Sequence, residues 1–219
     1  MGFVIGLFAA CVIFFIAFFI FSKMRYKTKY NAEYNVKNMF PYELNFKAKL
    51  QDNLLGNIFL VLYGACALAF FALASQKSLL PYSNVIILVA SILYIVINLS
   101  LVFVPLELVK LHLGVSIFSM VFTFTFFGAI SYVCFDYYQH FQEVPYLVLG
   151  IIGIIFCLFY FGVSMNPKLN APLNYEEVKN EDGSITYKRP KFFVLAFSEW
   201  LCIFANLLAI TIALVLYLL

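Results

Sequence analysis

The chain has 219 residues, of which 64% are hydrophobic and only 11% are charged. A soluble domain averages about 25% charged residues, so most of the surface of this chain cannot face water. The net charge of +3 is small and comes from the loops, which indicates membrane topology rather than nucleic-acid binding. Five cysteines lie in or beside apolar runs without a C-x-x-C pair, so we interpret them as packing residues.

Six apolar runs divide the chain, and each is close to the length that crosses a ~30 Å hydrocarbon core. They cover roughly 2–21, 54–75, 84–105, 111–134, 146–165 and 193–219. The first run lacks a basic leader and a small-residue cleavage site, which favours a retained helix over a signal peptide. The sequence therefore predicts an all-α polytopic membrane bundle with six transmembrane helices.

Lysine and arginine fall almost entirely on one side of these runs. Lys77 stands alone on one side, whereas all the others lie in the loops 23–53, 105–111 and 166–192. Cytoplasmic loops carry such an excess under the positive-inside rule. We therefore expect these loops in the cytoplasm, both termini on the non-cytoplasmic side, and an integral protein of the cell (plasma) membrane.

The spacing of the runs predicts three parts of the chain. A separate N-terminal transmembrane helix covers 1–22, a basic cytoplasmic or interfacial segment covers 23–53, and a five-helix membrane bundle covers 54–219 with a cytoplasmic loop at 166–192. In the basic segment tyrosine recurs every fourth residue, at Tyr26, Tyr30 and Tyr34. This pattern suits either a helix lying on anionic headgroups or an ordinary basic loop beside the membrane.

Two shorter signals occur in the loops. Pro41 suits the first position of a helix, so we expect a short interfacial helix before the second span. Asp182-Gly183 is a hairpin-turn signal between two short stretches with partial alternation, 175–179 and 184–188. An isolated hairpin is marginal in water, so this one needs the membrane surface or a partner to settle.

Polar and small residues recur at helical spacing within four of the spans. Such stripes should face the bundle interior, where they permit close packing and hydrogen bonds away from lipid. The stripes are Ser91, Tyr94 and Asn98; His112, Ser116, Ser119 and Thr123; Gly150, Gly153, Cys157, Tyr160 and Ser164; and Glu199, Cys202, Asn206, Ala209 and Ala213.

In the expected orientation the polar members fall in the cytoplasmic half of the membrane, below aliphatic and Phe-rich outer halves. This favours a polar pocket that opens toward the cytoplasm. The same residues could instead only pack the helices, since intramembrane hydrogen bonds contribute about 0.6 kcal/mol on average. The candidate substrate-binding residues are Asn57, Asn98, His112, Ser116, Ser119, Tyr160, Glu199 and Asn206.

Glu199 is the sharpest single candidate, because an intramembrane carboxylate is costly unless it is paired or hydrated. His112 is the only nearby ionisable residue on an inward stripe. The segment from Trp200 to Leu219 already spans ~30 Å, however. Glu199 could therefore also be a solvated residue at the headgroup boundary, with Trp200 in the interfacial belt.

Asp136, His140 and Glu143 follow i, i+4, i+7 spacing on the other side of the membrane. They are weak candidates for a divalent metal and could equally form the wet face of an amphipathic turn. The sequence has no H-E-x-x-H, G-x-S-x-G, Walker or G-x-G-x-x-G signature. We therefore expect no enzyme and no cofactor, with a membrane-embedded enzyme at the cytoplasmic interface as the alternative.

Two functions remain. The first is a small-solute or lipid transport component; the second is a non-catalytic accessory or scaffold subunit of a membrane complex. A cavity touching Asn98, Ser119 and Asn206 would favour transport, and a filled, hydrogen-bonded interior would favour the scaffold. The expected partners are the lipid bilayer and a membrane or cytoplasmic protein that contacts 23–53 and 166–192, with no nucleic acid.

Overall fold

The computed structural model describes residues 1–45, 50–76, 82–166, 176–180 and 184–219. Within these residues, six helices are long and apolar enough to cross a membrane. They are α1 (Gly2–Tyr30), α3 (Leu54–Gln76), α4 (Ser83–Ser100), α5 (Val109–Phe141), α6 (Val144–Ser164) and α8 (Val194–Leu218). Each coincides with one predicted span, which confirms the prediction of an all-α bundle. Such runs form helices because lipid offers no partner to a backbone N–H or C=O group.

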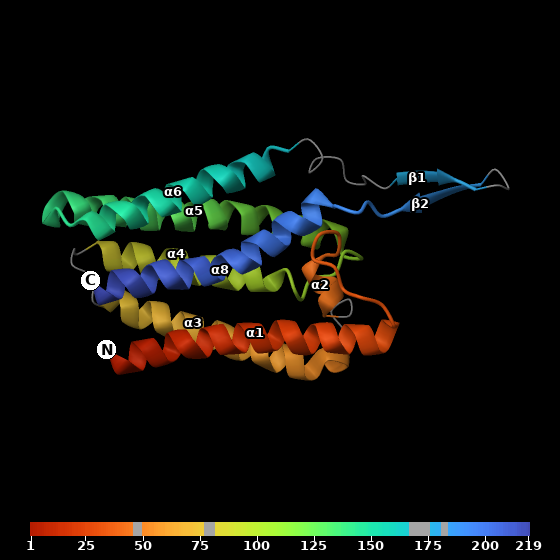
Figure 1. The fold of residues 1–219 in the computed structure, drawn as a ribbon, viewed down its shortest axis with the longest axis horizontal. Helices are drawn as coiled ribbons and strands as arrows, with labels where there is room; N and C mark the ends of the chain where they lie inside the picture. Colours follow the sequence, from red (N-terminus) through yellow and green to blue (C-terminus); the bar gives the residue numbers. More distant parts are fainter. Residues whose placement is uncertain (46–49, 77–81, 167–175, 181–183) are drawn as a thin grey trace.

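The helix α8 lies at the centre of the bundle. It contacts α1, α3, α4, α5 and α6, whereas α1 packs mainly along α3, and α5 packs mainly along α6. The helices run side by side, and both chain termini lie at the same end of the bundle (Figure 1). Rings fill much of the interior: Phe15 meets Tyr63 at 5.2 Å between ring centroids, and Tyr94 stacks on Phe126 at 4.6 Å.

Three helices end at different residues from those predicted. The first helix continues through the basic residues to Tyr30, because no Gly or Pro interrupts it, and it ends at Asn31 in the left-handed conformation (φ 48°). The fourth span likewise continues to Phe141. The third stops at Ser100, five residues before Pro105, and turns of the chain occupy the positions between them.

The short elements lie at the end of the bundle opposite the termini. The helix α2 (Pro41–Leu44) begins at Pro41 as predicted, and the 3₁₀ helix η1 (Leu50–Asn53) leads into α3. The strands β1 (Glu176–Lys179) and β2 (Ile185–Lys188) pair antiparallel, which confirms the two predicted strands. The predicted Asp182-Gly183 turn lies outside the described residues. The hairpin projects well beyond the helices (Figure 1).

The predicted division of the chain at residues 22 and 53 stays a prediction. In the structure, α1 is packed along its length against α3 and also contacts α8. Its buried residues Cys11, Phe15 and Phe18 belong to the same core cluster as Trp200. The first helix therefore shares one continuous core with the helices that follow it.

Candidate functional site

The eight predicted pocket residues are all buried, with at most 6% of each residue exposed. The stripes that contain them face inward as predicted in the third, fourth and last spans, where every stripe member is buried. In the fifth span Tyr160, Gly150 and Gly153 are buried, while Cys157 and Ser164 are half-buried. The helical spacing therefore found the interior faces, and the contacts between helices decide which residues meet.

Glu199 and His112 form a buried pair between α8 and α5. Glu199 Oε1 lies 3.0 Å from His112 Nε2 and accepts a hydrogen bond of 2.6 Å from Ser116 Oγ. Both partners of the pair are at most 2% exposed. Glu199 is therefore not the solvated headgroup residue that the length of the last span allowed, because α5 and the loops cover it.

The hydrogen bonds restrict where the protons of this pair lie. His112 Nδ1 lies 2.7 Å from the carbonyl oxygen of Val104, which can only accept, so Nδ1 carries a proton. The contact with Glu199 needs one more proton, on the imidazole or on the carboxyl group. The pair carries no net charge in either arrangement, which lowers the free-energy cost of burying it. Glu199 Oε2 has no hydrogen-bond partner among the described residues.

Aromatic rings close this pair off from the loop side. The ring centroids of Phe40 and Tyr42 lie 5.6 and 5.3 Å from that of His112, and Phe193 packs on Phe40 at 5.2 Å. We call Phe40, Tyr42 and Phe193 the aromatic cap. All three are at most 4% exposed. Burial raises the pKa of Tyr42, so its hydroxyl stays neutral at physiological pH.

A set of polar contacts fastens the loop after α1 to the chain that enters α8. Arg189 binds Glu43 through two parallel contacts, Nη1–Oε2 at 2.8 Å and Nη2–Oε1 at 3.0 Å. Asn38 donates to the carbonyl of Pro190 at 3.3 Å, and its own carbonyl accepts from Arg189 at 3.2 Å. The backbone N–H of Phe193 donates to the Lys37 carbonyl at 2.8 Å. We call these residues the loop clasp.

Trp200 extends the clasp into the bundle. Its indole N–H lies 2.9 Å from both Tyr34 Oη and the Met39 carbonyl, and Tyr34 donates to the Phe40 carbonyl at 2.7 Å. Burial raises the pKa of Tyr34 well above its ordinary value. Trp200 is fully buried, so its side chain contacts other residues of the protein and is not exposed to lipid headgroups. A buried indole needs an acceptor, and the loop supplies it.

A second polar group ties four helices together deeper in the bundle. Asn98 accepts a hydrogen bond from Ser119, and its amide nitrogen lies 3.5 Å from Thr123 Oγ1 and 3.4 Å from the Cys202 carbonyl. The Tyr160 hydroxyl lies 2.6 Å from Cys202 Sγ. The group joins α4, α5, α6 and α8, and each of its members is buried. The hydrogen-bonding atoms of these side chains therefore find partners within the group.

The two remaining pocket candidates stand elsewhere. Asn206 donates to the carbonyls of Cys202 and Ile203 in its own helix, and its Oδ1 has no hydrogen-bond partner among the described residues. Asn57 is buried on α3. The structure therefore divides the predicted pocket between the Glu199 pair, the Asn98 group and these two separate positions.

Cavities occur in other parts of the bundle. The described residues line a groove of about 360 Å³ where α1 meets η1 and α3, an opening of about 350 Å³ near the two termini, and a small gap between α3, α4, α5 and α8. None of these three is lined by Asn98, Ser119 or Asn206. The other predicted pocket residues do not line any of these three cavities either.

The weak metal candidates do not form a ligand set. His140 Nδ1 donates to the Asp136 backbone carbonyl at 2.9 Å, and the Asp136 carboxylate accepts a hydrogen bond from Tyr82. This bond raises the pKa of Tyr82 to about 12. Glu143 lies beyond the end of α5 and precedes α6. Within the described ranges, no three His, Cys, Asp or Glu side chains are placed to hold a metal ion.

Sequence reasoning missed the loop clasp and one further polar contact. Asn53 donates to Ser22 Oγ at 2.8 Å and lies 3.3 Å from Asn45 Oδ1. These residues stand at the ends of apolar runs, where polar residues are ordinary. Glu43 offered a weak signal, because Pro41 begins α2 and a glutamate at the third helical position often bonds the residue before the helix. It does so here, with the Phe40 N–H at 2.7 Å.

The fold and the buried contacts define the class: an integral membrane protein with six apolar helices, of which five are in contact with the central helix α8. No family model, no curated protein and no solved structure matches the chain.

Proposed function

We propose that this six-span membrane protein is a non-catalytic accessory or scaffold subunit of a membrane complex, and that it acts through its cytoplasmic loops. The observation that carries the proposal is the loop clasp with the hairpin beside it. The clasp holds the loop after α1 and the chain before α8 in one arrangement, and β1 and β2 project beyond it (Figure 1). The partner is a membrane or cytoplasmic protein that contacts 23–53 and 166–192.

The hairpin offers a surface that suits such a partner. Val178 is 38% exposed and Ile185 is 49% exposed, although both belong to paired strands. A two-stranded hairpin has no apolar face of its own to bury and is marginal in water. Val178 and Ile185 lie on opposite faces, because their cross-strand partners are Thr186 and Lys179, so a protein that covers either face would bury one apolar residue and stabilise the hairpin.

The hydrogen bonds of the Asn98 group support this proposal over transport. The group makes them within the bundle, and none of the three cavities described above is lined by its members. Interhelical hydrogen bonds of this kind join membrane helices. We assign the Asn98 group to holding four helices together.

In the proposed orientation the loops lie in the cytoplasm, and both termini lie on the non-cytoplasmic side of the cell membrane. Thirteen of the fourteen Lys and Arg residues belong to the loops at one side of the six spans. Their excess would keep these loops in the cytoplasm. The clasp and the hairpin would then face cytoplasmic proteins.

Purification of the intact protein from its own membrane tests the proposal. We expect the wild-type chain to purify in mild detergent with a second protein in fixed stoichiometry. Replacing 176–188 with a Gly-Ser linker of equal length should release that protein. Gly128→Ala is the matched control, because a Cβ there meets nothing within 4 Å, and it should retain the complex. A wild-type chain that purifies alone, or a linker variant that keeps the partner, would contradict the proposal.

The buried Glu199 pair favours a second candidate, a small-solute or lipid transport component. One carboxylate oxygen in this pair has no partner among the described residues, although the site is almost fully buried. Ionisable groups inside membrane helices often mark transport pathways. If the aromatic cap moved, a cytoplasmic solute or proton would reach Glu199 first.

Flux measurements on the purified chain in liposomes separate the two candidates. Transport predicts a flux that Glu199→Gln abolishes, because glutamine cannot exchange a proton. Ser100→Ala is the control, since Ser100 bonds only its own helix in the described structure. A wild-type chain that shows no flux for a panel of ions and small solutes would leave the scaffold proposal in place.

A further inference from the structure

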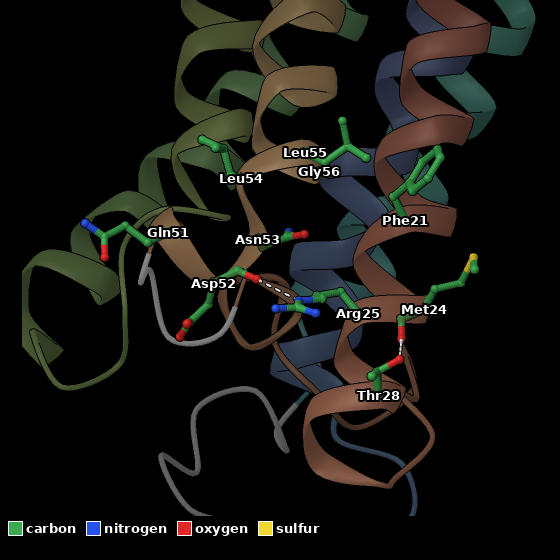
Figure 2. Close-up of a pocket in the computed structure, with 10 residues that line it drawn as sticks. All are labelled: Phe21, Met24, Arg25, Thr28, Gln51, Asp52, Asn53, Leu54, Leu55 and Gly56. Carbon is green, nitrogen blue, oxygen red and sulfur yellow. Dashed lines mark hydrogen bonds between the residues drawn. The ribbon is translucent and has the colours of Figure 1, made fainter.

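The largest groove described above lies where α1 leaves the predicted membrane span. Its lining comes from two segments that are far apart along the chain: the end of α1, and η1 with the start of α3 (Figure 2). The lining residues are Phe21, Met24, Arg25, Thr28, Gln51, Asp52, Asn53, Leu54, Leu55 and Gly56. Neither segment contributes to the Glu199 pair or to the Asn98 group.

A close helix crossing forms the inner end of the groove. A Cβ added to Gly56 would overlap Ser22 Oγ and the Asn53 side chain, so a larger residue there would displace these two side chains from the crossing of α3 and α1. Asn53 then bonds Ser22 across the crossing at 2.8 Å. Beyond this point the Asp52 backbone in η1 accepts a hydrogen bond from Arg25, and the Gln51 side chain points away from Arg25 (Figure 2).

The groove changes from apolar to polar along α1. Phe21, Leu54 and Leu55 line its membrane end and are 40%, 62% and 49% exposed. Arg25 and Thr28 lie one and two turns further along α1, toward the loops, which is a distance of about 6 to 10 Å. Since residues 2–21 already span ~30 Å, this change falls at the depth where the hydrocarbon of a bilayer gives way to phosphate groups.

The polar end of the groove is suited to an anion. Arg25 Nε donates to the Asp52 backbone carbonyl at 3.3 Å, which holds the guanidinium beside the opening. Asp52 forms an ion pair with Lys29, and Lys27 forms one with Glu33. Among the described residues Arg25 has no carboxylate partner. A guanidinium fork matches two oxygens of a phosphate group.

We propose that this groove binds one anionic glycerophospholipid from the leaflet that faces the loops. The lipid phosphate accepts hydrogen bonds from Arg25, and an acyl chain lies along Phe21, Leu54 and Leu55. The order of apolar and charged surface along the groove matches the order of groups in the lipid. The groove includes part of the segment 23–53, but neither the clasp nor the hairpin, which carry the scaffold proposal, lines it.

Native mass spectrometry of the intact chain tests the proposal. The wild-type protein is released from nanodiscs that contain equal amounts of phosphatidylglycerol and phosphatidylcholine. We expect one phosphatidylglycerol to stay bound to each chain, in excess over phosphatidylcholine. Arg25→Gln should lower that retention about tenfold, which is the loss expected for one charge-assisted contact.

Lys27→Gln is the matched control, because it removes one positive charge two residues from Arg25 but breaks only the exposed pair with Glu33. It should retain the lipid. Equal loss in both variants would show a general effect of basic residues and would overturn the site. Since the wild-type competition needs no variant, equal retention of the two lipids would overturn the proposal even if Arg25→Gln failed to fold. Displacement of the lipid by inorganic phosphate alone would also overturn it, because the groove would then bind only an anion.

Discussion

The buried side chains of Glu199 and His112 depend on each other for their stability. Each group alone would be expensive to bury, and together they share a proton and remain neutral. Ser116 supports the carboxylate at 2.6 Å, and the aromatic cap keeps water from it. The pair therefore stabilises the contact between α5 and α8 only while both partners are present.

His112→Leu should destabilise the protein by about 3 kcal/mol or more, because Glu199 then stays buried without its partner. Adding Glu199→Leu should recover most of that loss, since an apolar pair replaces the whole ion pair. Chemical unfolding in detergent micelles measures both variants. Losses that simply add up in the double variant would show that the two side chains do not depend on each other.

The contact between Arg189 and Glu43 is the ion pair of the loop clasp. Arg189→Gln should destabilise the folded chain by about 1 kcal/mol, because the pair is bidentate but partly open to screening by water and salt. In a Glu43→Gln background the same change should cost much less. A double-mutant cycle on thermal unfolding in detergent measures this coupling. A coupling energy of zero would show that this ion pair does not stabilise the clasp.

Close crossings explain how the helices pair. Gly153 on α6 lies against Ser131 on α5, where an added Cβ would overlap the Ser131 hydroxyl and come within 3.4 Å of the Phe127 carbonyl oxygen. Ser131 itself bonds that carbonyl at 2.7 Å. Gly56 plays the same part between α3 and α1. Small residues at such positions let helix backbones approach closely in a membrane.

Gly153→Ala should therefore destabilise the protein by about 1 to 3 kcal/mol through overpacking against α5. Gly162→Ala lies on the same helix, where a Cβ meets nothing within 4 Å, so it should be neutral or slightly stabilising. Thermal unfolding in detergent compares the two variants directly. Equal effects of the two changes would show that the crossing at Gly153 is loose enough to accept a methyl group.

The sequence predicted the inward faces of the helices and His112 as the candidate partner of Glu199, but it did not predict the other contacts between helices. Asn98, Glu199 and His112 were placed on inward faces because lipid excludes polar groups and the helix repeat puts them in line. Which face meets which neighbour depends on helix rotation and order in space, and one sequence does not encode these visibly. Arg189 and Glu43, 146 residues apart, carried no pattern that linked them.

Helix ends were harder to predict than helix interiors. The expected end of the first span followed the change from apolar to basic residues at 21, whereas the helix continues to Tyr30. An α-helix makes the same internal backbone hydrogen bonds in lipid and in water, so a change in side-chain composition does not by itself mark where the helix ends. The position of Asn31 in the left-handed conformation marks the stop instead.

At the scale of the whole molecule, the clasp, the hairpin and the basic loops all gather at the end opposite the two termini (Figure 1). An even number of spans requires both termini on one side of the membrane. Under the positive-inside rule, the charge bias of the loops would place this end in the cytoplasm. The proposed scaffold function depends on this orientation, because the hairpin must reach its partner.

Cysteine labelling in intact cells tests the orientation. We expect Lys179→Cys, on the exposed hairpin, to react with a membrane-impermeant maleimide only after the cells are permeabilised. Gly2→Cys should react in intact cells, because Gly2 is exposed near the opposite end of the bundle. The unmodified chain gives the background, since Cys11, Cys134 and Cys202 are buried. Labelling of the hairpin from outside would reverse the topology and contradict the scaffold proposal.

The central position of α8 has a consequence for how the protein is made. This helix is synthesised after the other five, yet it touches each of them. Until it enters the membrane, His112 and Asn98 lack the partners that it supplies, and the loop after α1 has no Trp200 to bind. The first five helices must therefore remain in a loose, incomplete assembly until α8 inserts. A chain cut short before residue 194 should be an early target for membrane proteases.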